Sequence, residues 1–73
     1  MDFSTRLKMF RNAQKLTQKE ISEAIGVSLR GYQWYEQGKF EPDIEKLIKL
    51  ADIFGVSVDT LIGHNFPQDS LMD

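Results

Sequence analysis

Three residues, Gly26-Val27-Ser28, separate two segments that both have the apolar spacing of a helix. The segment before them starts at Thr17, and the segment after them ends at Gly38. Serine is a favoured N-cap, and glycine directly after the last periodic residue is typical of a left-handed C-terminal cap. Two helices joined by so short a connection cannot lie antiparallel, so the sequence predicts a steep crossing between them.

Similar start and stop signals occur along the rest of the chain. Asp2 is the expected N-cap of a first helix, and Thr17 with Glu20 can form the capping box of the second. Pro42 and Asp43 precede a fourth helix. No long stretch alternates apolar and polar residues as a strand does. We therefore expect an all-α fold of five short helices. They run from Phe3 to Gln14, from Thr17 to Gly26, from Ser28 to Gly38, from Ile44 to Phe54, and from Ser57 to Gly63.

The apolar positions of each helix predict which side faces the core. In the third helix, Tyr32 and Tyr35 lie on one side together with Val27 from the turn, so both tyrosines are predicted to be buried. The other predicted core positions are Phe3, Leu7, Phe10 and Ala13 in the first helix, Ile21, Ala24 and Ile25 in the second, Ile44, Leu47, Ile48 and Ala51 in the fourth, and Val58, Leu61 and Ile62 in the fifth.

Length and composition indicate one small domain. A chain of 73 residues is near the lower limit for a single unaided core. We expect a domain over residues 1–63 and a polar C-terminal tail over residues 64–73. The apolar runs are far shorter than the roughly 20 residues of a membrane span, and the first residues lack the apolar region of a signal peptide. A cytoplasmic location is therefore expected, with no membrane partner.

Catalytic and metal-binding functions are not expected. The sequence has no cysteine, a single histidine at His64, and no carboxylate pair of convincing spacing. Metal sites that need thiolates or a histidine cluster are therefore excluded. We expect no enzyme activity, no metal, no cofactor and no small-molecule ligand.

The net charge of −2 conceals an uneven distribution. Residues 1–40 contain seven basic and four acidic residues, whereas residues 41–73 contain two basic and seven acidic ones. Proteins that bind nucleic acid usually carry a basic surface, which the net charge argues against. An anion-binding surface, if one exists, would therefore lie in residues 1–40. The alternative is a chance scatter of solvated charges.

Several motifs hold together without a gap over residues 6–63. They are Arg6-Leu7, Arg11, LTQ at 16–18, IGVS at 25–28, YE at 35–36, GK at 38–39, Pro42, LIKLA at 47–51 and FGVS at 54–57. This combination resembles the helix-turn-helix domain of the lambda-repressor and Cro type, also called the XRE family. The YQWYE segment resembles short repressor-like proteins of Gram-positive bacteria, their phages and mobile elements.

The resemblance implies a compact five-helix, lambda-repressor-like DNA-binding domain that regulates transcription, as a repressor. The helix from about residue 28 to 37 is expected to lie in the major groove of double-stranded DNA. One such helix reads only a few base pairs, so we expect a homodimer on a palindromic operator. Apolar residues near the end of the chain are candidates for the dimer interface: Val58, Leu61, Ile62, Phe66, Leu71 and Met72.

The side of the third helix away from the tyrosines carries the expected base contacts, because the family reads base edges from the matching positions. Arg30 can form a bidentate pair with guanine or hold a phosphate. Gln33 can pair with adenine or be solvated, and Leu29 offers apolar contact to a thymine methyl group. Trp34 suits a sugar-phosphate or base edge, and a protein contact is the rival interpretation.

Phosphate contacts are implied near the amino ends of the second and third helices and just after the third. A helix amino end has free amides and a partial positive charge, both of which suit a phosphate oxygen. The expected phosphate contacts are Thr17, Gln18, Ser28, Lys39 and Phe40. Arg11 and Glu36 resemble a family ion pair that ties the first helix to the third, which is a structural role.

A protein-interaction module on the same fold, such as an antitoxin or antirepressor, is the alternative function. Leu29, Trp34, Phe40 and Glu41 favour it, because they are apolar or acidic where DNA binders tend to be polar or basic. The two functions differ in whether the chain binds duplex DNA in a salt-dependent way.

Overall fold

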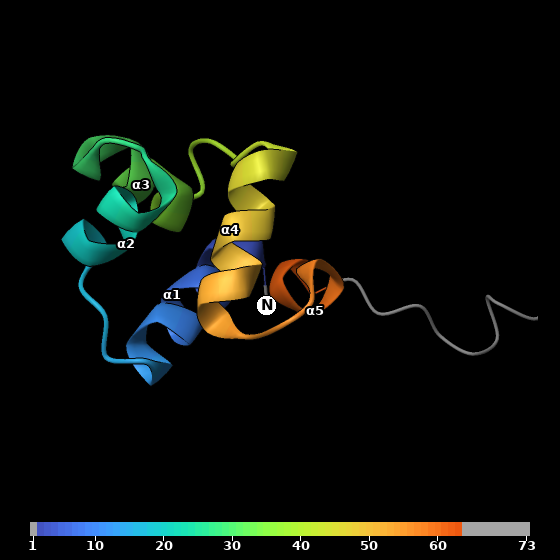
Figure 1. Cartoon of the computed structure of the whole chain (residues 1–73). Coiled ribbons are helices and arrows are strands. Elements are labelled where there is room, and N and C mark those ends of the chain that lie inside the picture. Colours follow the sequence, from blue (N-terminus) through green and yellow to red (C-terminus); the bar gives the residue numbers. More distant parts are fainter. Residues whose placement is uncertain (1, 64–73) are drawn as a thin grey trace, which may run out of the picture.

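The computed structural model describes residues 2–63. Five helices follow one another along the chain (Figure 1): α1 (Phe3–Ala13), α2 (Gln18–Ile25), α3 (Leu29–Gln37), α4 (Ile44–Phe54) and α5 (Val58–Ile62). Residues 2–63 contain no strand, so the predicted all-α fold of five helices is confirmed. The predicted tail lies outside the described residues, as do His64, Phe66, Leu71 and Met72. The domain boundary at residue 63 therefore stays a prediction.

Each helix begins at a side chain that caps it. The side chain of the N-cap residue accepts a hydrogen bond from the amide three residues later, at Asp2, Thr17, Ser28, Asp43 and Ser57. At Thr17 the bond is reciprocal, because the Glu20 side chain accepts from the Thr17 amide at 2.8 Å. Gly26 ends α2 with a φ of 79°, a left-handed conformation that turns the chain into α3 within three residues.

The core is built from all five helices. Tyr32 of α3, Leu7 of α1 and Leu50 of α4 are fully buried. The other buried apolar residues of the helices are Ile21, Ile25, Ala51, Phe54 and Leu61. Tyr35 is only partly buried, and its ring meets that of Tyr32 edge to face, with the centroids 6.2 Å apart. Burial is therefore confirmed for Tyr32 and holds in part for Tyr35.

The outer side of α3 is left uncovered by the way the helices are arranged. α2 and α3 lie at one end of the molecule and α5 at the other, with α1 and α4 between them (Figure 1). α3 packs on α1 and α2, whereas α5 packs on α1 and α4.

Among the described residues, no helix is long and apolar enough to cross a bilayer.

The prediction of which α4 residues face the core is wrong in part. Ile44 and Ile48 are exposed, with 74% and 48% of their surface accessible, whereas Leu50 and Phe54 face the core. The positions 44-47-48-51 and 47-50-51-54 both have the spacing of one helix face, and all of them are apolar. Periodicity alone cannot choose between these two sets, and α4 turns the second one toward α2 and α5.

The prediction that two alanines and Ile62 belong to the core is also wrong. Ala13 and Ala24 lie on the surface, as does Ile62 with 37% of its surface accessible. An alanine at the edge of an apolar stripe gains little from burial, because it has only one methyl group to remove from water. The core is therefore narrower than the apolar pattern predicts.

Replacing Leu50 by alanine should lower the free energy of unfolding by about 2–5 kcal/mol, because the change leaves a cavity in a closed core. Asp52→Ala, on the exposed side of the same helix, should cost less than about 1 kcal/mol, because that side chain contributes nothing to the core. Urea denaturation followed by circular dichroism measures both values. Equal losses would show that α4 is turned differently against the core.

Candidate nucleic-acid interface

The outer side of α3 carries the four side chains that the sequence predicts to contact bases. Leu29 and Arg30, in the first turn, are exposed, while Gln33 and Trp34, one turn later, are partly covered by neighbouring side chains. Their spacing places them on one side of the helix. Arg30 forms no salt bridge within residues 2–63, so its guanidinium group is available to a partner.

Gln33 is held by a side chain of α2. Its amide nitrogen donates to Oε1 of Gln18 at 3.2 Å, and the amide nitrogen of Gln18 donates to Oε1 of Glu36 at 3.0 Å. The sequence assigns Gln18 to a phosphate contact. In the structure, its side chain is engaged within the protein and lies between the buried carboxylate and the outer side of α3.

Trp34 packs against Phe40 from the loop between α3 and α4, with the ring centroids 5.1 Å apart. Phe40 keeps 57% of its surface accessible, and Trp34 is partly buried. An exposed aromatic pair of this kind suits contact with a sugar, a base edge or a protein. The structure therefore packs Trp34, a predicted base contact, against Phe40, a predicted phosphate contact.

The hydroxyl groups of Thr17 and Ser28 accept the capping hydrogen bonds of α2 and α3, at 3.0 and 2.9 Å. A hydroxyl that accepts still has a proton to donate, so each can also bond a phosphate oxygen. Lys39 follows the C-cap residue Gly38, and its amide donates to the carbonyl of Trp34. The ammonium group of Lys39, rather than its amide, is thus the part that an anion can reach.

A buried ion pair lies beneath this surface, between the two residues that the sequence pairs. Nε of Arg11 lies 2.6 Å from Oε2 of Glu36, and Nη2 lies 3.1 Å from Oε1. The Glu36 side chain is only 2% accessible. The hydroxyl of Tyr32 donates to Oε2 as well, so the carboxylate receives bonds from α1, from α2 through Gln18, and from α3 itself.

These contacts decide the charge state of the cluster. Burial acts to raise the pKa of Glu36, but the hydrogen bonds from Arg11, Tyr32 and Gln18 outweigh it and hold the pKa below its ordinary value of 4.5. The hydrogen bond to Glu36 raises the pKa of Arg11, and burial raises the pKa of Tyr32. At neutral pH the cluster therefore consists of a carboxylate, a guanidinium and a neutral phenol.

The sequence did not predict the hydrogen bonds of Tyr32 and Gln18 to Glu36. For Tyr32 a signal exists, because it stands four residues before Glu36 on one helix, where side chains are neighbours. Gln18 is distant from Glu36 in the sequence, and no local pattern marks their contact. Only the crossing of α2 and α3 brings the two side chains together.

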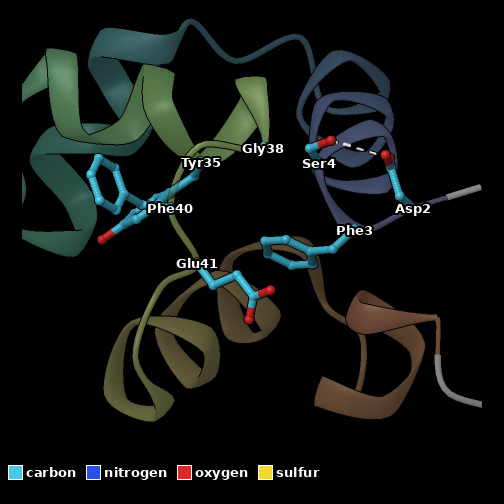
Figure 2. Close-up of a pocket in the computed structure, with 7 residues that line it drawn as sticks. All are labelled: Asp2, Phe3, Ser4, Tyr35, Gly38, Phe40 and Glu41. Atoms are coloured by element: carbon cyan, nitrogen blue, oxygen red, sulfur yellow. Dashed lines mark hydrogen bonds between the residues drawn. The ribbon is translucent and has the colours of Figure 1, made fainter.

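A small hollow lies between the start of α1 and the loop after α3 (Figure 2), lined by Asp2, Phe3, Ser4, Tyr35, Gly38, Phe40 and Glu41. Its volume of about 160 Å³ is below the roughly 300–1,000 Å³ of most ligand pockets. Its carboxylates belong to Asp2 and Glu41, which repel an anion, and Asp2 already accepts a hydrogen bond from Ser4. Residues 2–63 also contain no group of three side chains that could hold a metal ion.

Comparison with known families agrees with this geometry. The helix-turn-helix family HTH_3 matches residues 7–61, which include all of α2, the turn and α3. The chain therefore belongs to this helix-turn-helix family.

Three similar proteins share most of the chain. The SPbeta prophage-derived uncharacterized HTH-type transcriptional regulator YonR of Bacillus subtilis is 42% identical, over 94% of this chain and 64% of that protein. The cryptic phage CTXphi transcriptional repressor RstR of Vibrio cholerae is 40% identical, over 88% of this chain and 57% of that protein. The P22 c2 repressor protein, whose crystal structure contains a synthetic operator, is 25% identical in sequence. Its structure matches this one with a TM-score of 0.82, over 89% of this chain and 98% of that one. The chain thus spans less than two thirds of the length of YonR and RstR.

Arg11→Ala should lower the free energy of unfolding by about 3–5 kcal/mol at neutral pH, because it strands the buried carboxylate of Glu36. Folding lowers the pKa of Glu36. Its contribution to the free energy of unfolding is therefore fully present above pH 4.5, the ordinary pKa, and is lost as the pH falls through the pKa of the folded state. The difference between wild type and Arg11→Ala should therefore shrink in acid. Urea unfolding over a pH series measures it.

Arg6→Ala is the control for this pair, because Arg6 bonds the exposed carbonyl of Thr60 and contacts no buried charge. It should cost far less and should show no such pH dependence. A deficit of Arg11→Ala that stayed constant down to low pH would contradict a stabilising role for the ionised pair.

Proposed function

We propose that this chain is a sequence-specific DNA-binding transcription regulator, a repressor, that reads the major groove of double-stranded DNA with α3. The carrying observation is the outer side of α3, where Leu29, Arg30, Gln33 and Trp34 present hydrogen-bonding and apolar groups together. Base edges in the major groove offer donors, acceptors and methyl groups in such a mixture. The family match supports the proposal, and so does the similarity to a repressor whose structure contains an operator.

Each side chain of this surface has a distinct proposed contact. Arg30, exposed in the first turn of α3, forks onto O6 and N7 of a guanine. Leu29 contacts a thymine methyl group, for which its exposed side chain is suited. Trp34 and Phe40 together pack on a sugar or a base edge, which would remove their accessible aromatic surface from water.

The proposed phosphate contacts surround this surface. The amino end of α2 offers the hydroxyl of Thr17 together with free amides, and Ser28 offers the same at the start of α3. Lys39 adds a positive charge beyond the end of α3, next to Phe40. Gln18 approaches the backbone from the first residue of α2, although its amide group also serves Gln33.

We also propose that the protein acts as a homodimer on a palindromic operator. A two-fold axis would place two copies of α3 on half-sites about one helical turn apart. Ile44 and Ile48, exposed on one face of α4, supply apolar surface for a second copy, and this face carries both signs of charge in the Glu45–Lys49 pair. Leu61, an expected interface residue, is fully buried and belongs to the core instead.

The proposed function has two consequences for the setting in which the protein acts. A regulator must reach cellular DNA, which is consistent with the expected cytoplasmic location. The proposed role needs only binding, because occupation of the operator is itself the regulatory event, so it involves neither catalysis nor a cofactor.

Arg30→Ala should weaken binding to a selected operator by about 1–3 kcal/mol and relax the preference at one base pair, because a bidentate contact with guanine is lost. Lys8→Ala, on the exposed side of α1, is the control and should leave every base preference unchanged. The operator is obtained by in vitro selection, and fluorescence anisotropy measures affinity for each base at each position. An unchanged preference in Arg30→Ala would show that the reading face is assigned wrongly.

The same titrations distinguish the regulator from the alternative protein-interaction module. Phosphate contacts release counterions, so the logarithm of the affinity should fall steeply with the logarithm of the salt concentration. If the wild type bound no duplex even at about 50 mM salt, the antitoxin or antirepressor interpretation would replace this proposal.

Changing Ile44 and Ile48 together to serine should shift the protein from dimer to monomer, because it removes apolar surface from the proposed interface. Binding to the palindromic operator should weaken more than binding to an isolated half-site. Both side chains are exposed, so the fold should persist. Light scattering measures the mass, and Leu29→Ser, which removes apolar surface from α3, is the control. A dimer that survives the double change would exclude this face as the interface.

A further inference from the structure

A chain of hydrogen bonds connects the buried carboxylate of Glu36 to the outer side of α3. Glu36 accepts from the amide nitrogen of Gln18 at 3.0 Å, and the amide oxygen of Gln18 accepts from the amide nitrogen of Gln33 at 3.2 Å. Gln33 belongs to the proposed reading surface, whereas Glu36 is almost wholly inaccessible. Gln18, on α2, is the link between them.

Glu36 determines which group donates and which accepts in each of these hydrogen bonds. An ionised carboxylate can only accept hydrogen bonds, and it has about four positions at which to accept them. Arg11 fills two of these positions and the hydroxyl of Tyr32 a third. The remaining position faces Gln18, which must therefore present its NH₂ group, because its oxygen would meet the negative charge.

The orientation of Gln18 then fixes that of Gln33. With its NH₂ group toward Glu36, Gln18 presents its oxygen to Gln33, and only the NH₂ group of Gln33 can donate to it. A free glutamine amide can turn over and exchange its oxygen and nitrogen. Here such a turn would bring two oxygens together, so Gln33 keeps its own oxygen and one N–H for an outside partner.

We propose that Glu36, acting through Gln18, fixes the Gln33 amide so that Gln33 reads a base with an exocyclic amino group in the major groove. This inference rests on the proposed function. Adenine fits best, because its N6 amino group can donate to the Gln33 oxygen while its N7 accepts the remaining N–H. Cytosine offers an N4 amino group alone, whereas guanine and thymine present carbonyl oxygens to the Gln33 oxygen.

Gln18 is then a positioning residue for base reading as well as a neighbour of the DNA backbone. A side chain that only holds a phosphate weakens binding to all sequences alike, because phosphates carry no sequence information. A side chain that orients Gln33 changes the ratio of affinities at one base pair. The ratio therefore separates the two roles.

Gln18→Met tests the inference, because it keeps the length of the side chain but removes its donor and its acceptor. The relevant base pair is the one whose preference disappears in Gln33→Ala. At that position the wild type should prefer adenine, and Gln18→Met should reduce the preference over guanine or thymine by about tenfold. The double variant should lose no more preference than Gln33→Ala alone, because both changes break one chain of contacts. Lys19→Ala, on the exposed side of α2, should weaken binding to all four sequences equally.

A second measurement needs no DNA. In nuclear magnetic resonance spectra of the free protein, Gln18→Met should shift the side-chain NH₂ signals of Gln33 and speed their exchange with water, while Lys19→Ala should not. Unchanged Gln33 signals, an equal loss over the four bases, or a wild-type preference for guanine or thymine would each overturn the inference. If the wild type bound no duplex although the Gln33 signals shifted as expected, the proposed function would fail instead.

Discussion

The ionised carboxylate of Glu36 is buried where three helices meet, and the placement of those helices depends on its partners. A buried charge without partners costs several kcal/mol, so the fold must bring donors to it. Arg11 comes from α1, Gln18 from α2, and Tyr32 from the preceding turn of α3. Apolar contacts would tolerate small shifts between these helices, but hydrogen bonds of 2.5–3.1 Å to one carboxylate do not.

This arrangement joins stability and recognition in one cluster. The inner side of α3 supplies Tyr32 to the core and Glu36 to the ion pair, which fixes the angle at which the outer side faces a partner. The tight turn at Gly26 then determines where α2 ends and α3 begins, so Gln18 comes within reach of both Glu36 and Gln33. If α3 reads DNA as proposed, a change in this cluster should therefore affect base reading as well as stability, because Arg11 and Gln18 bind the same carboxylate.

The sequence predicted features that depend on neighbouring residues and failed where distant segments decide. Helix bounds follow from local hydrogen bonds such as those at Thr17 and Ser28, so they could be read directly. The face of α4 could not, because Ile48 and Leu50 both belong to apolar sets with helical spacing, and only packing against α2 and α5 selects one. The ion pair of Arg11 with Glu36 was reached through family resemblance, whereas the role of Gln18 needs the three-dimensional crossing of two helices.

The charge distribution explains why oriented side chains matter in this protein. A net charge of −2 gives little long-range attraction to DNA, so the proposed function requires affinity from a few local contacts, which we place near α2 and α3. Arg30 and Lys39 supply fixed charges there, and the helix amino ends supply amides. Side chains that are already held in place lose less entropy on binding. The hydrogen bond of Gln33 to Gln18 and the aromatic contact of Trp34 with Phe40 hold these two proposed contact residues in the free protein. With weak general attraction, such pre-organisation raises the share of the binding energy that depends on sequence.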